Sequence, residues 1–256
     1  MSKKNLPEPM AATQKLQQDL ATLKLSYCLQ EYAALASQAN QQQWEHTQFL
    51  QCLMTGEVQA LQDRRTQRRL DSAKFPVRKT LDQFDWQWPE SLNELQVKHL
   101  FRFGFIQEKA NVIFLGSVGL GKTHLSIALG YQACLQGYSV LFSSAVEIIN
   151  ALTAAHALGR LKSELAKYLK PQLLIVDELG YLPIDKTGAD LLFQVISGRY
   201  ERGSLVISTN KAFADWTAIF NHDASLTSAV LDRLLHYAEV IQIAGKSYRM
   251  RGKVDT

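Results

Sequence analysis

A glycine-rich loop at residues 116–123 carries the clearest chemical signal in the sequence. It reads Gly-Ser-Val-Gly-Leu-Gly-Lys-Thr and fits the spacing G-x-x-x-x-G-K-S/T, in which backbone N–H groups surround the phosphates of a nucleotide. Its three glycines let the backbone turn tightly and approach an anion with no Cβ in the way. Lys122 would reach the β- and γ-phosphates, and the Thr123 hydroxyl would ligate Mg²⁺. The candidate nucleotide ligands are Gly116, Ser117, Val118, Gly119, Leu120, Gly121, Lys122, Thr123 and His124.

Two adjacent carboxylates, Asp177 and Glu178, follow an apolar run at residues 173–176 that reads as a buried strand. Asp177 at the end of that strand can hold Mg²⁺ directly or through water. Glu178 is placed to polarise an attacking water as a general base. The same pair could be a solvated strand end, but the phosphate loop upstream favours the catalytic interpretation. Asn210 ends the next strand, where a γ-phosphate sensor would lie, although an asparagine alone is also a turn signal.

Strand and helix patterns alternate from residue 111 onward, which indicates a parallel sheet with crossover helices. The expected strands are residues 111–115, 138–142, 172–177, 204–209 and 239–243. The expected helices are residues 122–136, 145–168 with a break near Gly159, 187–200 and 225–237. The phosphate loop and the acidic pair would then meet at the carboxyl edge of an α/β sheet, where such sheets bind ligands.

The first 85 residues have another pattern, and we expect a small all-helical domain there. Residues 1–9, with two prolines and two lysines, are expected to form a disordered tail. Apolar spacing predicts a helix that starts near Ala11 and carries Leu16, Leu20, Leu23 and Tyr27. A second helix is expected from Trp44 through Leu61, with inward residues Phe49, Leu50, Leu53 and Val58. Residues 85–89 read as an extended connector, so the helical domain would span residues 10–85 and the sheet domain residues 86–256.

A basic segment closes the helical region. Residues 63–79 hold seven basic side chains against two acids, more than the modest net charge of +4 would suggest. On a helix, Arg64 and Arg68 would be i,i+4 neighbours that repel unless an anion neutralises them, as would Arg65 and Arg69. The segment favours salt-sensitive, poorly sequence-specific contact with the phosphates of double-stranded DNA over a merely solvated basic face. The candidate DNA contacts are Arg64, Arg65, Arg68, Arg69, Lys74, Arg78 and Lys79.

The composition of the 256 residues excludes several protein classes. No run of 18 apolar residues occurs, so no membrane span is expected. Residues 1–7 lack the apolar stretch of a secretory signal. The cysteines at 28, 52 and 134 are scattered, so we expect reduced core residues of a cytoplasmic protein rather than disulfide or zinc partners.

Four signatures together resemble the IstB-type insertion-sequence ATP-binding proteins, which are AAA+ ATPases similar to the bacterial helicase loader DnaC. They are the phosphate loop, Asp-Glu-Leu-Gly-Tyr-Leu-Pro at 177–183, Arg-Tyr-Glu-Arg-Gly-Ser at 199–204 and Leu-Asp-Arg-Leu-Leu-His at 231–236. The run at 177–183 is the most particular, and the resemblance extends over nearly the whole chain. It implies ATP and Mg²⁺ as cofactors and an α/β fold: a P-loop AAA+ domain of three α/β/α layers with five parallel strands. It also implies a reduced or absent helical lid, since the sequence ends soon after Arg249.

The resemblance implies roles for arginines that the residues alone leave open. Arg233 matches the arginine finger that reaches the γ-phosphate bound by a neighbouring subunit, with Arg199 and Arg202 as competitors for the role. Arg249 looks like a second, phosphate-sensing position. A finger that acts across subunits implies a homo-oligomer assembled through the ATP site.

The function implied is an ATP-hydrolysing helper of insertion-sequence transposition, which assembles on double-stranded target DNA and recruits or stimulates the cognate transposase. The segment with Arg160 and Lys162 is a secondary candidate for lining the DNA path of the oligomer, or else a solvated loop. One alternative is a replicative helicase loader, whose N-terminal helices would bind a helicase. Another is a scaffold that holds ATP without catalysis, against which Glu178 argues because a scaffold needs no base.

Overall fold

Residues 9–251 are described by the computed structural model, in which the chain divides into two compact units, Met1–Arg68 and Arg69–Thr256. The tail expected at residues 1–9 lies outside the described residues except for Pro9. The division falls inside helix α3 (His46–Ala73), so the domain boundary expected after residue 85 lies within the second unit. The reason is packing, because Ala73 and Phe84 are buried in the core of the second unit.

The first unit begins with two helices where the sequence predicted one. Helix α1 (Pro9–Thr22) and helix α2 (Ser26–Gln41) are separated by a short turn. Within that turn Lys24 has φ 59°, a left-handed conformation that cannot continue a right-handed helix. The prediction of a single helix running through Tyr27 was therefore wrong.

Helix α3 (His46–Ala73) begins close to the expected residue 44 but continues past Leu61 into the basic segment. Leu53 is buried with Leu20 and Cys28 in the small core of this unit, and Phe49 packs against that core. The expectation that Leu50 and Val58 also face inward was wrong, since they are 55% and 54% exposed.

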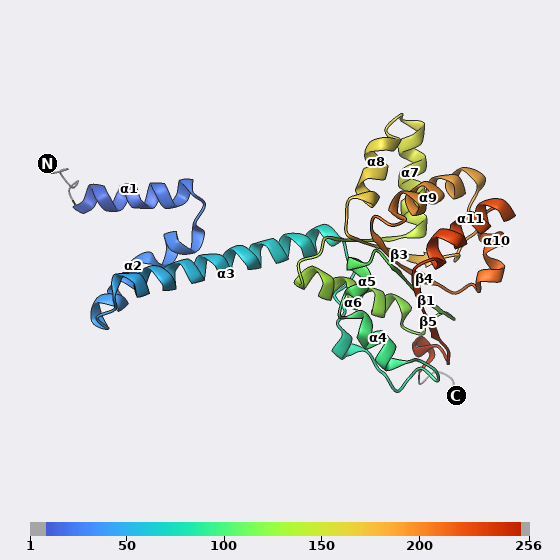
Figure 1. Ribbon diagram of the computed structural model, residues 1–256, viewed down its shortest axis with the longest axis horizontal. Coiled ribbons are helices and arrows are strands. Elements are labelled where there is room, and N and C mark those ends of the chain that lie inside the picture. Colours follow the sequence, from blue (N-terminus) through green and yellow to red (C-terminus); the bar gives the residue numbers. More distant parts are fainter. Residues whose placement is uncertain (1–8, 252–256) are drawn as a thin grey trace. The chain divides into compact units, whose positions relative to one another are not determined.

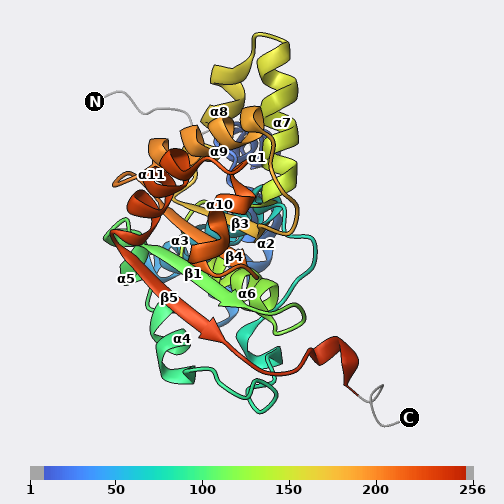
Figure 2. The same ribbon diagram turned by 90° about the vertical axis from the view of Figure 1, so that its right-hand side faces the viewer.

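A five-stranded parallel sheet forms the centre of the second unit, as predicted (Figure 1). The strands are β1 (Asn111–Gly116), β2 (Val140–Ser144), β3 (Leu173–Leu179), β4 (Ser204–Thr209) and β5 (Ala238–Ile243). Each begins within two residues of its expected start. Their spatial order is β2-β3-β4-β1-β5, which places β1 between β4 and the edge strand β5 (Figure 2).

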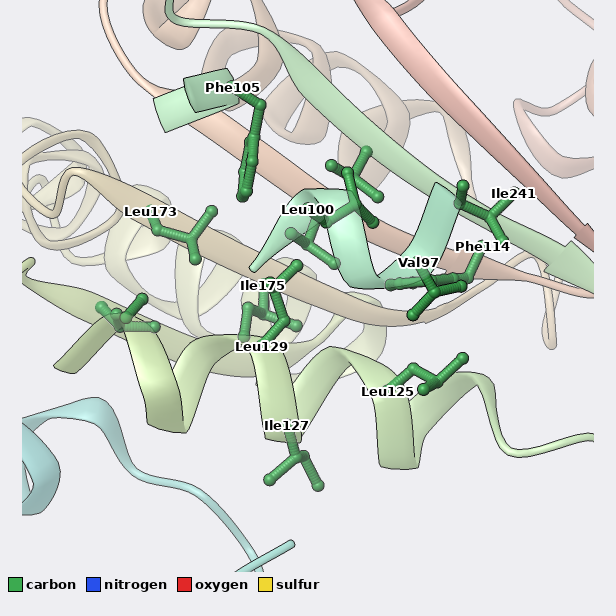
Figure 3. Packing of buried hydrophobic residues seen from close by; sticks show 14 of the residues in the cluster. Val97, Leu100, Phe105, Phe114, Leu125, Ile127, Leu129, Leu173, Ile175 and Ile241 are labelled. Carbon is green, nitrogen blue, oxygen red and sulfur yellow. The ribbon is translucent and has the colours of Figure 1, made fainter. Parts of the chain in front are cut away.

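Helices cover both faces of the sheet and complete three layers. Because strand side chains alternate between faces, Leu173 and Ile175 of β3 pack toward one helical layer and Leu174 and Val176 toward the other. The first layer consists of α4 (Glu94–Leu100), α5 (Gly104–Gln107) and α6 (Lys122–Leu135), whose packing is seen in Figure 3. The second consists of α7 (Ala145–Ala157), α8 (Leu161–Leu169), α9 (Lys186–Arg199), α10 (Trp216–Ile219) and α11 (Ala224–Leu235).

The connections include three short 3-10 helices, η1 (Leu81–Gln83), η2 (Phe213–Asp215) and η3 (Tyr248–Met250), the last of which follows β5. The expected break at Gly159 is present between α7 and α8, where this glycine has φ 67°. Among residues 9–251, no helix combines the length and the apolar character that crossing a membrane requires.

Candidate nucleotide-binding site

The phosphate loop connects the carboxyl end of β1 to the first turn of α6, as the sequence predicted. Gly119 and Gly121 have φ values of 82° and 87°, which residues other than glycine adopt only with strain. Space is also restricted, because a Cβ on Gly121 would lie 2.6 Å from the ring of Phe84. Gly121 is the N-cap residue of α6, so the N–H groups of the first helical turn border the loop.

Lys122 is held by the loop itself. Its Nζ donates hydrogen bonds of 2.7 Å to the backbone oxygens of Gly116 and Ser117. Burial lowers the pKa of Lys122, the carboxylates of Asp177 and Glu178 oppose that effect, and the positive charge of Arg249 adds to it. The ammonium group is therefore partly desolvated, and an anion beside it would stabilise its charge.

Thr123 and Asp177 lie side by side where a metal ion would be needed. The Thr123 hydroxyl donates to the Asp177 carboxylate at 3.0 and 2.9 Å from its two oxygens, and Asp177 is only 5% exposed. A hydroxyl and a carboxylate are the hard oxygen ligands that Mg²⁺ prefers. The described residues contain no group of three or more His, Cys, Asp or Glu side chains able to hold a metal. These two residues fit Mg²⁺ if phosphate oxygens and water complete its coordination.

Glu178 has an unusual backbone and an exposed side chain. Its φ of 59° lies in the left-handed region, and the pairing of β3 with β4 shifts register between Val176 and Leu179. Ser208 of β4 contacts both acidic residues at this point: its hydroxyl accepts from the Glu178 N–H at 2.9 Å and donates to Asp177 Oδ1. No role was predicted for Ser208 from the sequence, although a serine within an apolar strand was the available signal.

A cavity of about 560 Å³ opens along the phosphate loop. Most of the predicted site residues line it, namely Val118, Gly119, Leu120, Gly121, Lys122, Thr123, His124, Glu178, Asn210 and Arg249. Gly116, Ser117 and Asp177 do not line it, but they lie behind it through their hydrogen bonds to Lys122 and Thr123. The structure thus brings the loop, the acidic pair, Asn210 and Arg249 together at one sheet edge.

One wall of this cavity comes from residues 77–89, part of which was expected to be only an extended connector. Phe84 and Trp88 both line the cavity, and the Trp88 indole N–H donates to the Lys246 carbonyl at 2.8 Å. The segment after β5 closes the same wall, because the Tyr248 N–H donates to the Gly119 carbonyl at 2.9 Å. An ion pair of 2.8 Å between Arg251 and Asp85 connects the two segments again.

His124 supports this wall from the first turn of α6. Its Nε2 lies 2.8 Å from the Thr80 carbonyl, and its ring meets that of Phe84 edge to face, with 5.4 Å between centroids. Burial lowers the pKa of His124, which the bond to Thr80 only partly opposes. A neutral imidazole, donating from Nε2, fits this environment.

Comparison with known proteins decides the family. The model of the family described as "IstB-like ATP binding protein" matches residues 18–256. The chain belongs to this family. A protein of insertion sequence IS5376 from Geobacillus stearothermophilus, whose name describes it as ATP-binding, is 38% identical over 231 residues, covering 90% of this chain and 92% of the relative. Its counterpart in IS21 of Pseudomonas aeruginosa is 37% identical over 234 residues, covering 91% and 88%.

Among solved structures, the DnaC helicase loader has a TM-score of 0.53 and 22% sequence identity. The match covers 64% of this chain and 96% of that one, and it shows the same fold. The resemblance to the IstB-like family and the AAA+ fold class predicted from the sequence are both confirmed.

The arginines of this IstB-like chain differ sharply in their surroundings. Arg199 is 1% exposed and donates four hydrogen bonds to backbone carbonyls, namely those of Tyr168, Pro171, Gln172 and Ser204. Burial lowers the pKa of Arg199 to about 10. With both terminal nitrogens bonded inside its own chain, Arg199 cannot act as a finger toward another subunit.

Arg233 lies on α11, where its Nη1 donates to the Ala229 carbonyl at 2.9 Å and its guanidinium lies 5.0 Å from the ring centroid of Phe193. Arg202 is exposed in the turn before β4. Neither lines the cavity of its own chain, whereas Arg249 does. The structure therefore leaves Arg233 and Arg202 as the finger candidates.

The basic side chains of residues 63–79 also differ in their surroundings. In the first unit, Arg64 forms a 2.8 Å ion pair with the buried Glu57, which accepts the Tyr27 and Cys28 N–H groups at the start of α2. Arg65 and Arg68 are exposed on α3. The sequence alone did not distinguish these three arginines.

In the second unit, Arg78 lies 4.9 Å from the ring centroid of Tyr131, and Lys79 lines the nucleotide cavity. Arg69 is half-buried and Lys74 is exposed. Arg160 and Lys162 are exposed at the start of α8, next to the turn that separates it from α7.

Proposed function

We propose that this chain is an ATP-hydrolysing AAA+ helper of insertion-sequence transposition. It would assemble as a homo-oligomer on double-stranded DNA and act with the transposase of its element. Membership of the IstB-like family supports the biological setting. The observation that carries the chemistry is that Lys122, Thr123 and Glu178 line one cavity, with Asp177 bonded to Thr123 directly behind it.

Each of these residues has a separate task in the proposed reaction. The loop N–H groups and Lys122 bind the phosphates of ATP, for which Lys122 exchanges its bonds to the loop carbonyls. Thr123 and Asp177 would hold Mg²⁺, and the ion would supply positive charge beside the phosphates. Glu178 takes a proton from the attacking water, and Asn210 orients that water against the γ-phosphate.

Completion of the site by a second subunit is the next part of the proposal. In the transition state, negative charge spreads over the transferred phosphoryl group, and an arginine from outside can neutralise it. Arg233 is our candidate because it lies away from the cavity of its own chain and matches the finger of the family. ATP hydrolysis would then depend on assembly, and a monomer would turn over slowly.

DNA contact is proposed mainly for the exposed arginines of α3, Arg65 and Arg68, with help from Arg69, Lys74 and Arg78. We expect Arg64 to contribute less, because Glu57 already binds it. Contacts to phosphates give affinity without sequence information, so binding should fall steeply with salt. Binding to duplex DNA without a helicase would separate this function from helicase loading.

The test of the catalytic proposal is Glu178→Gln in the full chain, with Glu108→Gln as the matched control. Glu108 is exposed and lies outside the cavity lining. We expect the Glu178 variant to bind a fluorescent ATP analogue with Mg²⁺ as the wild type does and to lose about 10²-fold or more in turnover. The control should keep both. Wild-type turnover in the Glu178 variant would exclude the proposed base.

A further inference from the structure

The acidic pair occupies a local irregularity of the sheet. Val176 is paired with Ile207 and Leu179 with Thr209, so Asp177 and Glu178 together lie opposite the single residue Ser208. Two residues facing one is the definition of a β-bulge, a device that changes the direction of a side chain next to a functional site.

The Ser208 hydroxyl occupies the place where the regular pairing is interrupted. It accepts the Glu178 N–H at 2.9 Å and donates its own proton to Asp177 Oδ1. A serine hydroxyl has one donor and two acceptor positions, so both bonds can exist together. Ser208 is 1% exposed, which leaves its hydroxyl largely shielded from solvent.

The bulge has opposite effects on the two carboxylates. Asp177 stays buried beside Thr123, whereas Glu178 is exposed and lines the cavity. The left-handed backbone of Glu178, with φ 59°, is strained for a residue with a side chain. The hydrogen bond from the Glu178 N–H to Ser208 helps to hold that conformation.

We propose that Ser208 is the positioning residue of the acidic pair: through one hydroxyl it sets the orientation of the Asp177 carboxylate and the direction of the Glu178 side chain. The inference rests on the proposed hydrolysis of ATP at this site. Ser208 borders the nucleotide cavity, but in this role it acts through its two hydrogen-bonded neighbours on β3. Alanine removes both bonds, whereas threonine keeps the hydroxyl and has a branched side chain suited to a strand.

The same strand offers a matched control. Ser204 is also fully buried, and its hydroxyl donates to the Phe105 carbonyl at 3.0 Å, at the amino end of β4 away from the cavity. Ser204→Ala therefore removes a buried hydroxyl and one hydrogen bond from β4 without touching the acidic pair. A merely structural role of Ser208 would make the two alanine variants alike.

Steady-state ATP turnover and binding of a fluorescent ATP analogue are measured for the wild type and for Ser208→Ala, Ser208→Thr and Ser204→Ala. Ser208→Ala should lose roughly 10- to 100-fold in kcat, as expected for a base displaced by a fraction of an ångström to 1 Å, with little change in KM. It should also need more Mg²⁺ for half-maximal turnover. Ser208→Thr should regain most of kcat, and Ser204→Ala should keep it. Wild-type kcat in folded Ser208→Ala, or equal losses in both alanine variants, would overturn the inference.

A second readout does not depend on turnover. Hydrogen exchange of the Glu178 amide should accelerate at least about tenfold in Ser208→Ala and stay slow in Ser204→Ala and the wild type, because only the first loses the acceptor of that amide. If the wild type hydrolyses no ATP, the proposed function fails and this measurement still tests the role of Ser208. Unchanged exchange in Ser208→Ala would refute it.

Discussion

Replacing Arg199 by alanine should destabilise the sheet unit strongly, although this arginine lies in one of the signatures of the family. Two of its four acceptors, the carbonyls of Tyr168 and Ser204, are in buried hydrogen bonds, and those of Pro171 and Gln172 are partly accessible to water. A buried group left without its partner costs about 1–3 kcal/mol, so the two buried carbonyls together give about 4 kcal/mol. Water can replace the guanidinium at the other two.

For a unit of this size, 1 kcal/mol shifts the melting temperature by about 2–4 °C, so Arg199→Ala should melt about 8–16 °C lower. Thermal unfolding followed by far-ultraviolet circular dichroism measures this shift. Arg202→Ala is the control, because Arg202 is exposed and its loss should change stability by less than about 0.5 kcal/mol. Arg199→Lys should be intermediate, since lysine keeps the charge but lacks the planar fork that reaches several carbonyls.

Two outcomes would contradict this reasoning. A melting temperature of Arg199→Ala within about 2 °C of the wild type would show that the four hydrogen bonds contribute little. Unchanged stability combined with lost ATP turnover would return Arg199 to the list of finger candidates.

Two further predictions concern the loop and the basic helix. Gly121→Ala should weaken binding of a fluorescent ATP analogue by at least about tenfold, because it strains a backbone with φ 87° and drives a Cβ toward Phe84. Gly159 is also left-handed but has open space around it, so the Gly159→Ala variant should bind the analogue normally. Equal affinity of the two variants would refute the steric argument. Arg68→Ala should lower the slope of log affinity against log salt concentration for duplex DNA by about 0.9. Arg64→Ala should chiefly lower the melting temperature, because it breaks the ion pair with Glu57. An unchanged slope in Arg68→Ala would remove that residue from the DNA contacts.

The sheet and its loop could be predicted because their signals are local. Strands β1 to β4 each carry a run of three or four apolar residues. Residues 116–123 have a fixed spacing that requires no knowledge of the rest of the fold. Parallel order then follows from the alternation of strands and helices. The catalytic roles of Lys122, Asp177 and Glu178 stay predictions, although their side chains do gather at one edge of the sheet.

The contacts that the sequence did not predict all depend on pairing between distant segments. Ser208 contacts both carboxylate residues only because β3 has one extra residue opposite β4, in the bulge between Val176 and Leu179. No pattern within either strand reveals that shift of register. Arg199 and Arg202 look alike in the sequence, but only the first is buried against the carbonyls of two neighbouring segments. The prediction that Leu50 faces inward was wrong for a related reason, because apolar periodicity does not indicate which side of α3 another helix covers.

The segment that follows β5 has a consequence for the gene as well as for the protein. A premature stop codon after Ile243 would leave all five strands and the entire phosphate loop encoded. The product would nevertheless lack the partners of Trp88, Gly119 and Asp85 that close one wall of the nucleotide cavity. A gene interrupted at that point would thus retain a recognisable phosphate-loop reading frame whose product has an opened cavity.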